Sequence, residues 1–193
     1  MTIDVSKFHV SNVIDTCSIW NILSSRLLFS TAIEAKCTFC CTNYVYYECV
    51  YKKRTNPSKE EMALRDRFIK ENGRKKFESF SLSIEDLQEI EILRNRKNLG
   101  KGELSSIVFA LKTKQAFLTD DQRARKLAAK VMKDRVVQTT PHLFGWLFFR
   151  GLLLDSDRVT IIQEHTSYDR PLAPYFEELY YEALRCRSIH PTS

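Results

Sequence analysis

Short apolar runs alternate with helical spacings of apolar residues over the first 140 residues of the chain. Runs rich in β-branched, aromatic and cysteine residues predict five strands, at residues 10–15, 38–42, 77–82, 115–119 and 136–138. The clearest helical spacing is that of Leu104, Ile107, Val108 and Leu111. Because strands that alternate with helices form parallel sheets, we expect an α/β fold with a central, mostly parallel sheet covered by helices.

Polar residues mark the ends of the predicted helices. One helix is expected from Ser18 to about residue 35, and another over residues 44–53. Capping signatures predict further helix starts at residues 58–61, 83–86 and 140–141. Beyond these, only helical patterns remain. The chain is therefore expected to consist of a domain at residues 1–140 and a C-terminal helical extension, residues 141–193, packed on it.

The composition is that of a folded protein with a sizeable core. The chain has 193 residues, of which 44% are hydrophobic, enough for one α/β domain with an extension. No apolar run reaches the roughly 18–20 residues of a membrane span, and the N-terminus has no basic-then-apolar signal pattern. We expect a cytoplasmic protein with no membrane partner.

Positive charge is concentrated in the first part of the chain. The formal net charge is +6, and residues 141–193 contain five Lys and Arg against seven Asp and Glu. Residues 1–140 therefore carry the whole excess, +8 against −2. A net positive charge in this part of the chain suits a nucleic-acid substrate, whose backbone carries negative phosphates. Charged residues are also common on any solvated protein surface.

Cysteines offer a second, weaker candidate for metal chemistry. The chain has six, of which Cys37, Cys40 and Cys41 form a local cluster. No second Cys/His pair at zinc-ligand spacing accompanies them. We expect reduced thiols that pack as small buried hydrophobes rather than a zinc site.

Five acidic residues stand where strands end or on otherwise apolar helices. Asp15 closes an apolar strand, and Asp120 and Asp121 follow another. Glu48 is the single charge among residues 44–51, and Glu103 follows a glycine-containing segment. A carboxylate in an apolar segment is costly unless it is compensated, and a hard divalent cation would compensate several that converge.

Each of these acids also has a plain structural interpretation. Asp120 or Asp121 could cap the helix predicted at residues 121–133. Glu103 could complement a helix dipole from the first turn. Asp15 could be a turn residue, and Glu48 could pair with a lysine or arginine. The joint pattern favours chemistry over these separate explanations.

The motifs around the acids resemble those of the PIN-domain family of nucleases, in particular the ribonuclease toxins of bacterial toxin–antitoxin pairs. The matching segments are Val13-Ile14-Asp15-Thr16-Cys17-Ser18-Ile19-Trp20-Asn21, Gly100-Lys101-Gly102-Glu103-Leu104 and Leu118-Thr119-Asp120-Asp121-Gln122-Arg123-Ala124-Arg125, with Glu48 as the second acid. The resemblance covers roughly residues 10–140. The chain departs from the family pattern at Cys17, which displaces the usual serine by one position, and at Ser105, where many relatives carry aspartate.

The resemblance implies a three-layer PIN-like fold and a Mg²⁺- or Mn²⁺-dependent endoribonuclease with one or two ions. The metal ligands implied are Asp15, Glu103 and Asp121, with Asp120 as the alternate for Asp121 and Glu48 binding directly or through water. Four further residues would orient water or carboxylates: Thr16, Ser18, Asn21 and Thr119. Metal ions in such sites activate water and stabilise the attacking and leaving oxygens, so no Ser or Cys nucleophile is needed. We expect no such role for Cys17, because its motif contains no histidine and the acidic surroundings disfavour a thiolate.

Basic and aromatic residues near the acidic motifs are candidates for substrate contacts. Lys101, Arg123 and Arg125 would grip phosphates, whereas Lys126 and Lys130 suit the solvated side of a helix. The tyrosines of residues 44–51 could stack on bases, but we expect them to pack in the core.

The predicted partners follow from this chemistry. RNA is the expected substrate, and a DNA or structure-specific nuclease is the main alternative. A non-catalytic nucleic-acid-binding module is the alternative from another class. An antitoxin or regulatory protein could restrain a toxin or defence effector of this kind. The apolar residues 143–154 and 175–184 could form that interface or a homodimer interface, and core packing explains them equally well.

Overall fold

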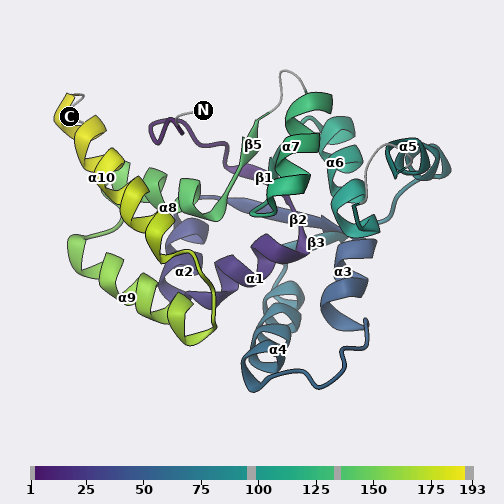
Figure 1. Ribbon diagram of the computed structural model, residues 1–193, viewed down its shortest axis with the longest axis horizontal. Helices are drawn as coiled ribbons and strands as arrows, with labels where there is room; N and C mark the ends of the chain where they lie inside the picture. The colour runs from purple at the N-terminus through teal and green to yellow at the C-terminus, as the bar shows by residue number, and fades with distance from the viewer. Residues whose placement is uncertain (1–2, 95–98, 133–135, 190–193) are drawn as a thin grey trace.

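Five parallel strands form the centre of the molecule (Figure 1). The computed structural model describes residues 3–94, 99–132 and 136–189. The strands are β1 (Ser11–Ile14), β2 (Thr38–Thr42), β3 (Phe77–Phe80), β4 (Ala116–Leu118) and β5 (Val137–Gln138), in the order β3-β2-β1-β4-β5. All neighbouring pairs are parallel. The sheet confirms the predicted α/β class and is consistent with a three-layer, PIN-like arrangement.

The strand order places β1 and β4 side by side at the middle of the sheet. Val13 of β1 pairs with Cys40 of β2 on one side and with Phe117 of β4 on the other. The chain builds outward from β1 through β2 to β3, and then returns to the opposite side of β1 for β4. Such a switch point opens a crevice beyond the carboxyl ends of the two strands. The first and last acidic motifs follow these two strands.

Ten helices occur within the described residues and cover both faces of the sheet. They are α1 (Thr16–Ser24), α2 (Arg26–Glu34), α3 (Asn43–Val50), α4 (Lys59–Gly73), α5 (Ile84–Arg94), α6 (Lys101–Thr113), α7 (Gln122–Val131), α8 (Thr140–Phe149), α9 (Asp155–Ser167) and α10 (Ala173–Ile189). Adjacent strand residues face opposite layers, as Ile14 and Val13 illustrate. Ile14 packs in the core shared with α1–α4 and α8–α10, whereas Val13 packs in the core shared with α6 and α7.

Several predicted helix limits are wrong. The helix expected from Ser18 to about residue 35 is divided at Ser25, whose backbone is extended with φ −111° and ψ 120°. The Ser25 hydroxyl accepts a hydrogen bond from the Leu28 N–H at 3.0 Å and donates one to Glu164 at 2.5 Å. The helix expected over residues 44–53 ends at Val50. The helix expected at residues 121–133 ends at Val131, and residue 133 itself lies outside the described residues.

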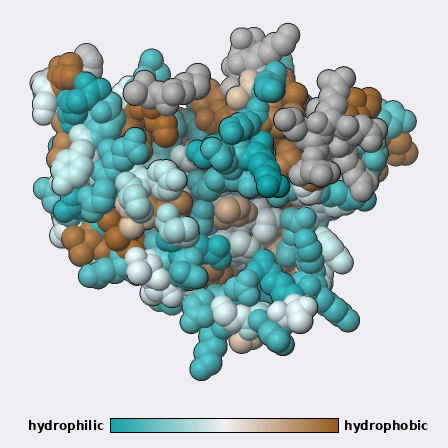
Figure 2. All heavy atoms as spheres, in the orientation of Figure 1, coloured by the Kyte–Doolittle hydropathy of each residue, from teal (hydrophilic) through white to brown (hydrophobic). Residues whose placement is uncertain are grey.

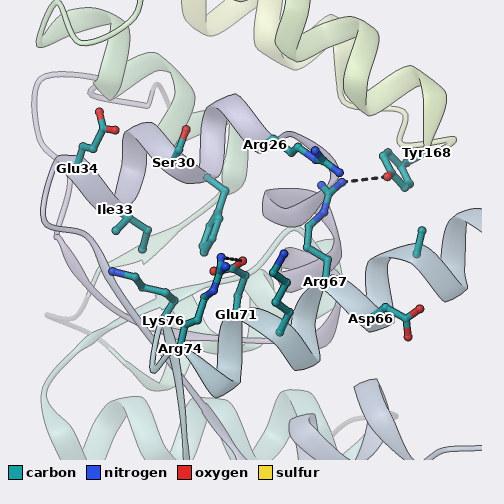
Figure 3. Close-up of a pocket in the computed structure, with 13 residues that line it drawn as sticks. Arg26, Ser30, Ile33, Glu34, Asp66, Arg67, Glu71, Arg74, Lys76 and Tyr168 are labelled. Carbon is teal, nitrogen blue, oxygen red and sulfur yellow. Dashed lines mark hydrogen bonds and ion pairs between the residues drawn. The ribbon is translucent and has the colours of Figure 1, made fainter.

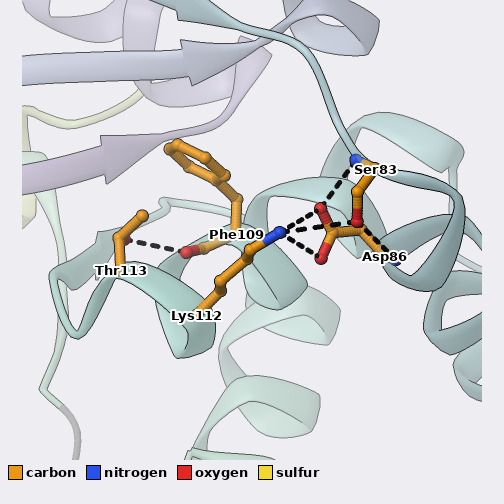
Figure 4. Close-up of polar contacts among 5 residues, drawn as sticks. All are labelled: Ser83, Asp86, Phe109, Lys112 and Thr113. Carbon is orange, nitrogen blue, oxygen red and sulfur yellow. Dashed lines mark hydrogen bonds and ion pairs between the residues drawn. The ribbon is translucent and has the colours of Figure 1, made fainter.

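Two predicted capping boxes are confirmed. Ser58 and Glu61 exchange hydrogen bonds at the start of α4. Before α5, the Asp86 carboxylate accepts from the Ser83 N–H at 2.8 Å, and the Ser83 hydroxyl accepts from the Asp86 N–H at 3.3 Å. Figure 4 shows that the same carboxylate pairs with Lys112 of α6, at 2.9 and 3.1 Å, which fastens α5 to α6.

The C-terminal helices contribute to the main hydrophobic core. Every residue of α8 from Thr140 to Phe149 is buried, although the helix cap is Thr139 and not Thr140 as the sequence indicated. The buried stripe of α10, which includes Phe176, joins the core that α1–α4 also share. The apolar positions predicted as core or interface are therefore largely used in packing, while Tyr175 and Tyr181 stay exposed. Residues 190–193 of the predicted extension lie outside the described residues.

The surface in the orientation of Figure 2 is largely hydrophilic, with apolar side chains in small separate patches. Among the described residues, no helix has the length and hydropathy that crossing a membrane requires.

Candidate active site

Asp15 connects the end of β1 to the start of α1. Its side chain is 1% exposed and caps α1 by accepting a hydrogen bond from the Ser18 N–H at 2.9 Å. The other carboxylate oxygen accepts from the Thr119 hydroxyl, which follows β4. Burial raises the pKa of Asp15 to about 7, against the opposing effect of these hydrogen bonds. Asp15 thus has the local role of a cap, in a setting where its charge is poorly solvated.

The Thr119 hydroxyl connects Asp15 to the acidic pair that follows. Besides donating to Asp15, it accepts a hydrogen bond from the Asp121 N–H at 3.1 Å. Asp121 in turn caps α7, since one of its oxygens accepts from the Ala124 N–H at 2.7 Å. The capping interpretation is therefore correct for Asp121. No hydrogen bond within the described residues engages its other oxygen, which leaves that atom available to a ligand.

Asp120 is held by three hydrogen bonds from two other elements. Its carboxylate accepts from the Asn21 amide at 2.8 Å and from both the N–H and the hydroxyl of Thr140, at 2.9 and 2.6 Å. Its own N–H donates to the Ser18 hydroxyl at 2.9 Å. Asp120 therefore fastens the end of β4 to α1 and to the start of α8. Of the two adjacent acids, this arrangement favours Asp121 as a metal ligand.

Glu48 lies between α1 and α6. The Thr16 hydroxyl donates a hydrogen bond to one of its carboxylate oxygens at 2.8 Å. The same oxygen would lie 2.5 Å from a Cβ atom at Gly102, closer than real Cβ contacts occur. The missing side chain at Gly102 thus creates the space that Glu48 occupies. The lysine or arginine partner considered for Glu48 is absent among the described residues, and a threonine hydroxyl takes its place.

Glu103 stands in the first turn of α6, as the dipole interpretation requires. One of its carboxylate oxygens is buried and has no hydrogen-bond partner among the residues described. Burial raises the pKa of Glu103, and the nearby charges of Glu48 and Asp121 raise it further. Because each of these charges affects the Glu103 carboxylate, the acids on α3, on α6 and at the end of β4 lie near one another.

No Lys, Arg or His in the described part of the chain forms an ion pair with any of the five acids. The acids do not form a complete metal-binding site in this conformation. Among the described residues, no group of three His, Cys, Asp or Glu side chains is placed to hold one ion. The structure thus brings the acids together as neighbours whose oxygens are largely engaged by Thr, Ser and Asn donors.

The cysteines serve packing. Burial, followed by the charges of Asp15 and Asp120, raises the pKa of the Cys17 thiol to about 12, which disfavours a nucleophilic thiolate. Cys37, Cys40 and Cys41 are buried in the two cores, as predicted for small hydrophobes.

The predicted phosphate contacts occupy different positions. Lys101 is exposed beside the acids, with its Nζ atom 5.9 Å from the centre of the Tyr44 ring. Arg123 is exposed and Arg125 half-buried on α7, and neither forms an ion pair with an acid of the site in the described structure. A groove of about 740 Å³ beside α6 is lined by Glu48, Tyr44 and Lys101.

A separate groove, of about 640 Å³, lies between α2 and α4 and contains none of the acids. Figure 3 shows Arg67 at its edge, where the guanidinium donates a hydrogen bond to the Tyr168 hydroxyl at 3.1 Å. Basic side chains alternate with acidic ones along this groove, including the pair Arg74 and Glu71.

The sequence patterns do not identify two residues that the structure places at or near the site. Thr140 resembles an ordinary helix cap in the sequence, and its pairing with Asp120 depends on the fold. Arg170, from the turn after α9, is half-buried with an Nε atom that lacks a partner in the described structure. Its positive charge opposes the rise in the Cys17 pKa, so it lies near Cys17. No local motif marks either residue.

No protein-family model matches the chain, and no curated protein matches it either.

Proposed function

We propose that this protein is a divalent-metal-dependent endoribonuclease that hydrolyses phosphodiester bonds of RNA. The observation that supports the proposal most is Glu103, whose buried oxygen lacks a partner while the charges of Glu48 and Asp121 act on the same carboxylate. Neighbouring carboxylates without cationic partners destabilise one another. A hard divalent cation would remove that cost.

We propose that Asp15, Glu103 and Asp121 would hold such a cation, with Glu48 as a direct or water-mediated contact; their side chains would have to move closer together to do so. When bound, Mg²⁺ or Mn²⁺ would activate water and stabilise charge on the reacting phosphate. The protein's own contribution is orientation. Thr119 holds Asp15, and Thr16 holds Glu48. Such supporting hydrogen bonds fix the direction of ligands and tune their affinity for metal.

RNA is favoured by the motif resemblance, and the basic charge of residues 1–140 suits either nucleic acid. By the same resemblance, we propose that a protein partner restrains the activity, as in a toxin or defence effector. A DNA-cutting enzyme would share the chemistry, so the substrate has to be assigned by experiment.

The proposal is tested by cleavage of matched single-stranded RNA and DNA oligonucleotides in Mn²⁺, Mg²⁺ or EDTA. Wild type should cut RNA only with metal, and Asp15→Asn should be inactive while remaining folded. Asp66→Asn is the matched control, because Asp66 is an exposed acid in the groove between α2 and α4. Cutting of DNA alone would reassign the substrate, and equal cutting by Asp15→Asn would refute the site.

A further inference from the structure

Two tyrosines project into solvent, Tyr47 on α3 and Tyr51 as the residue that caps its C-terminal end. Tyr47 is 55% exposed and Tyr51 is 63% exposed, with ring centres 6.3 Å apart. The prediction that the tyrosines of residues 44–51 pack in the core is right for Tyr46, which packs against Phe68, and wrong for this pair. Large aromatic surfaces left in water next to a polar site indicate a binding surface.

Tyr47 borders a groove that includes Glu48 of the acidic set, whereas Tyr51 does not line it. Tyr44 and Tyr47 line it together with Glu48, and the backbone of Gly100 lines it on the side of α6. Its volume of about 740 Å³ accommodates a ligand the size of a nucleotide. Because Glu48 belongs both to this groove and to the acidic set, a ligand in the groove lies next to the proposed site of cleavage.

Two lysines give the groove positive charge. Lys52 and Lys101 both line it and are exposed, and neither forms an ion pair within the described residues. Lys101 lies over the Tyr44 ring at 5.9 Å, and the charge of Lys52 reaches Glu103. Aromatic faces interleaved with cations are the pattern by which proteins hold single-stranded nucleic acid.

We infer that this groove is a subsite for one unpaired nucleobase, which stacks on Tyr47 while Lys52 and Lys101 contact the adjoining phosphates. The inference rests on the proposed function for its link to cleavage, but base binding is measured without cleavage. Stacking requires a free base face, and a duplex hides that face. The groove therefore selects unpaired strands. An acidic peptide would engage the lysines but would gain little from the tyrosine face.

The test is fluorescence anisotropy of the full chain with a labelled single-stranded RNA 12-mer, in EDTA and again in Ca²⁺. Tyr47→Leu should weaken binding by roughly five- to a hundred-fold, the range expected for one lost base stack. Tyr47→Phe keeps the ring and should bind as wild type does. Tyr181→Leu is the matched control, since Tyr181 of α10 is 62% exposed. A duplex of the same 12-mer with its complementary strand should bind more weakly.

Several results would overturn the inference. These are unchanged RNA binding by Tyr47→Leu, no binding of single strands by wild type, and equal binding of duplex. Competition by poly-glutamate that is unaffected by Tyr47→Leu would assign the groove to an acidic protein partner. The outcomes also separate the two proposals. If RNA binding depends on Tyr47 but no RNA is cleaved, the nuclease proposal fails and the subsite stands. If Tyr47→Leu changes neither cleavage nor binding, the nuclease proposal stands and the subsite fails.

Discussion

Replacing Gly102 by alanine should impair activity while leaving the fold nearly intact. The new Cβ would lie 2.5 Å from one carboxylate oxygen of Glu48 and 2.9 Å from its Cδ atom. Since Glu48 is a flexible side chain, it would rotate away and the backbone would stay in place. The movement would break the hydrogen bond from Thr16 to Glu48. Gly102→Ala therefore removes Glu48 from the site without changing its charge.

The expected change in stability is small because two effects oppose each other. Alanine gains up to about 1 kcal/mol over glycine in a helix, and Gly102 lies within α6. A hydrogen bond to a charged group contributes about 1.5–3 kcal/mol, and less here because Glu48 is half-buried. The net loss should not exceed about 2 kcal/mol, or about 4–8 °C in Tm for a chain of this size.

Activity should fall at least about tenfold, the equivalent of 1.4 kcal/mol of transition-state stabilisation. The assay is metal-dependent RNA cleavage, with Tm measured in parallel. Gly73→Ala is the control, because a Cβ there meets nothing within 4 Å. If the effect passes through Glu48, Gly102→Ala and Glu48→Gln should not be additive. Wild-type cleavage by Gly102→Ala, or full additivity with Glu48→Gln, would refute the reasoning.

Three further predictions concern stability. Because burial raises the Asp15 pKa to about 7, its contribution to stability is present below pH 4 and lost as pH rises through 7; without metal, Asp15→Asn should therefore raise Tm at pH 8 but not at pH 4, and a gain independent of pH would contradict this. Thr140→Val should cost about 1–3 kcal/mol in urea unfolding, since it leaves Asp120 without a hydroxyl donor; an unchanged midpoint would show that Asp120 needs no such support. Phe176→Ala should cost about 3–5 kcal/mol in one cooperative transition, because Phe176 is fully buried in the shared core; a separate early transition would mean that the C-terminal helices unfold alone.

The strands and the layered arrangement follow from local pattern. Val13 and Ile14 are both apolar because β1 is covered on both faces. A short continuous apolar run is the sequence pattern typical of a buried parallel strand. The break at Ser25 was not predicted, since the residues around it keep a helical spacing. That break depends on the Ser25 hydroxyl and on Glu164, which is 139 residues away in the chain.

In the candidate site too, the sequence predicts some features and the tertiary fold determines others. The motif offers two adjacent acids, so the sequence prediction names Asp121 and keeps Asp120 as its alternate. Asn21 and Thr140 separate the two, because they engage Asp120 alone through the tertiary fold. Exposure of Tyr47 was also missed. A helical pattern gives the face on which a residue lies, whereas the groove beside Tyr47 depends on where α6 packs.

Binding of Mn²⁺ tests the central claim most directly, because it does not depend on choosing the right substrate. Thermal unfolding would be followed across a Mn²⁺ titration for wild type, Asp15→Asn, Glu103→Gln and the control Asp66→Asn. A site formed by the acids predicts that wild type and the control gain about 2.7 kcal/mol at a hundredfold excess over Kd, while Asp15→Asn and Glu103→Gln gain much less. Equal gains in all four proteins, or none in wild type, would contradict the metal site.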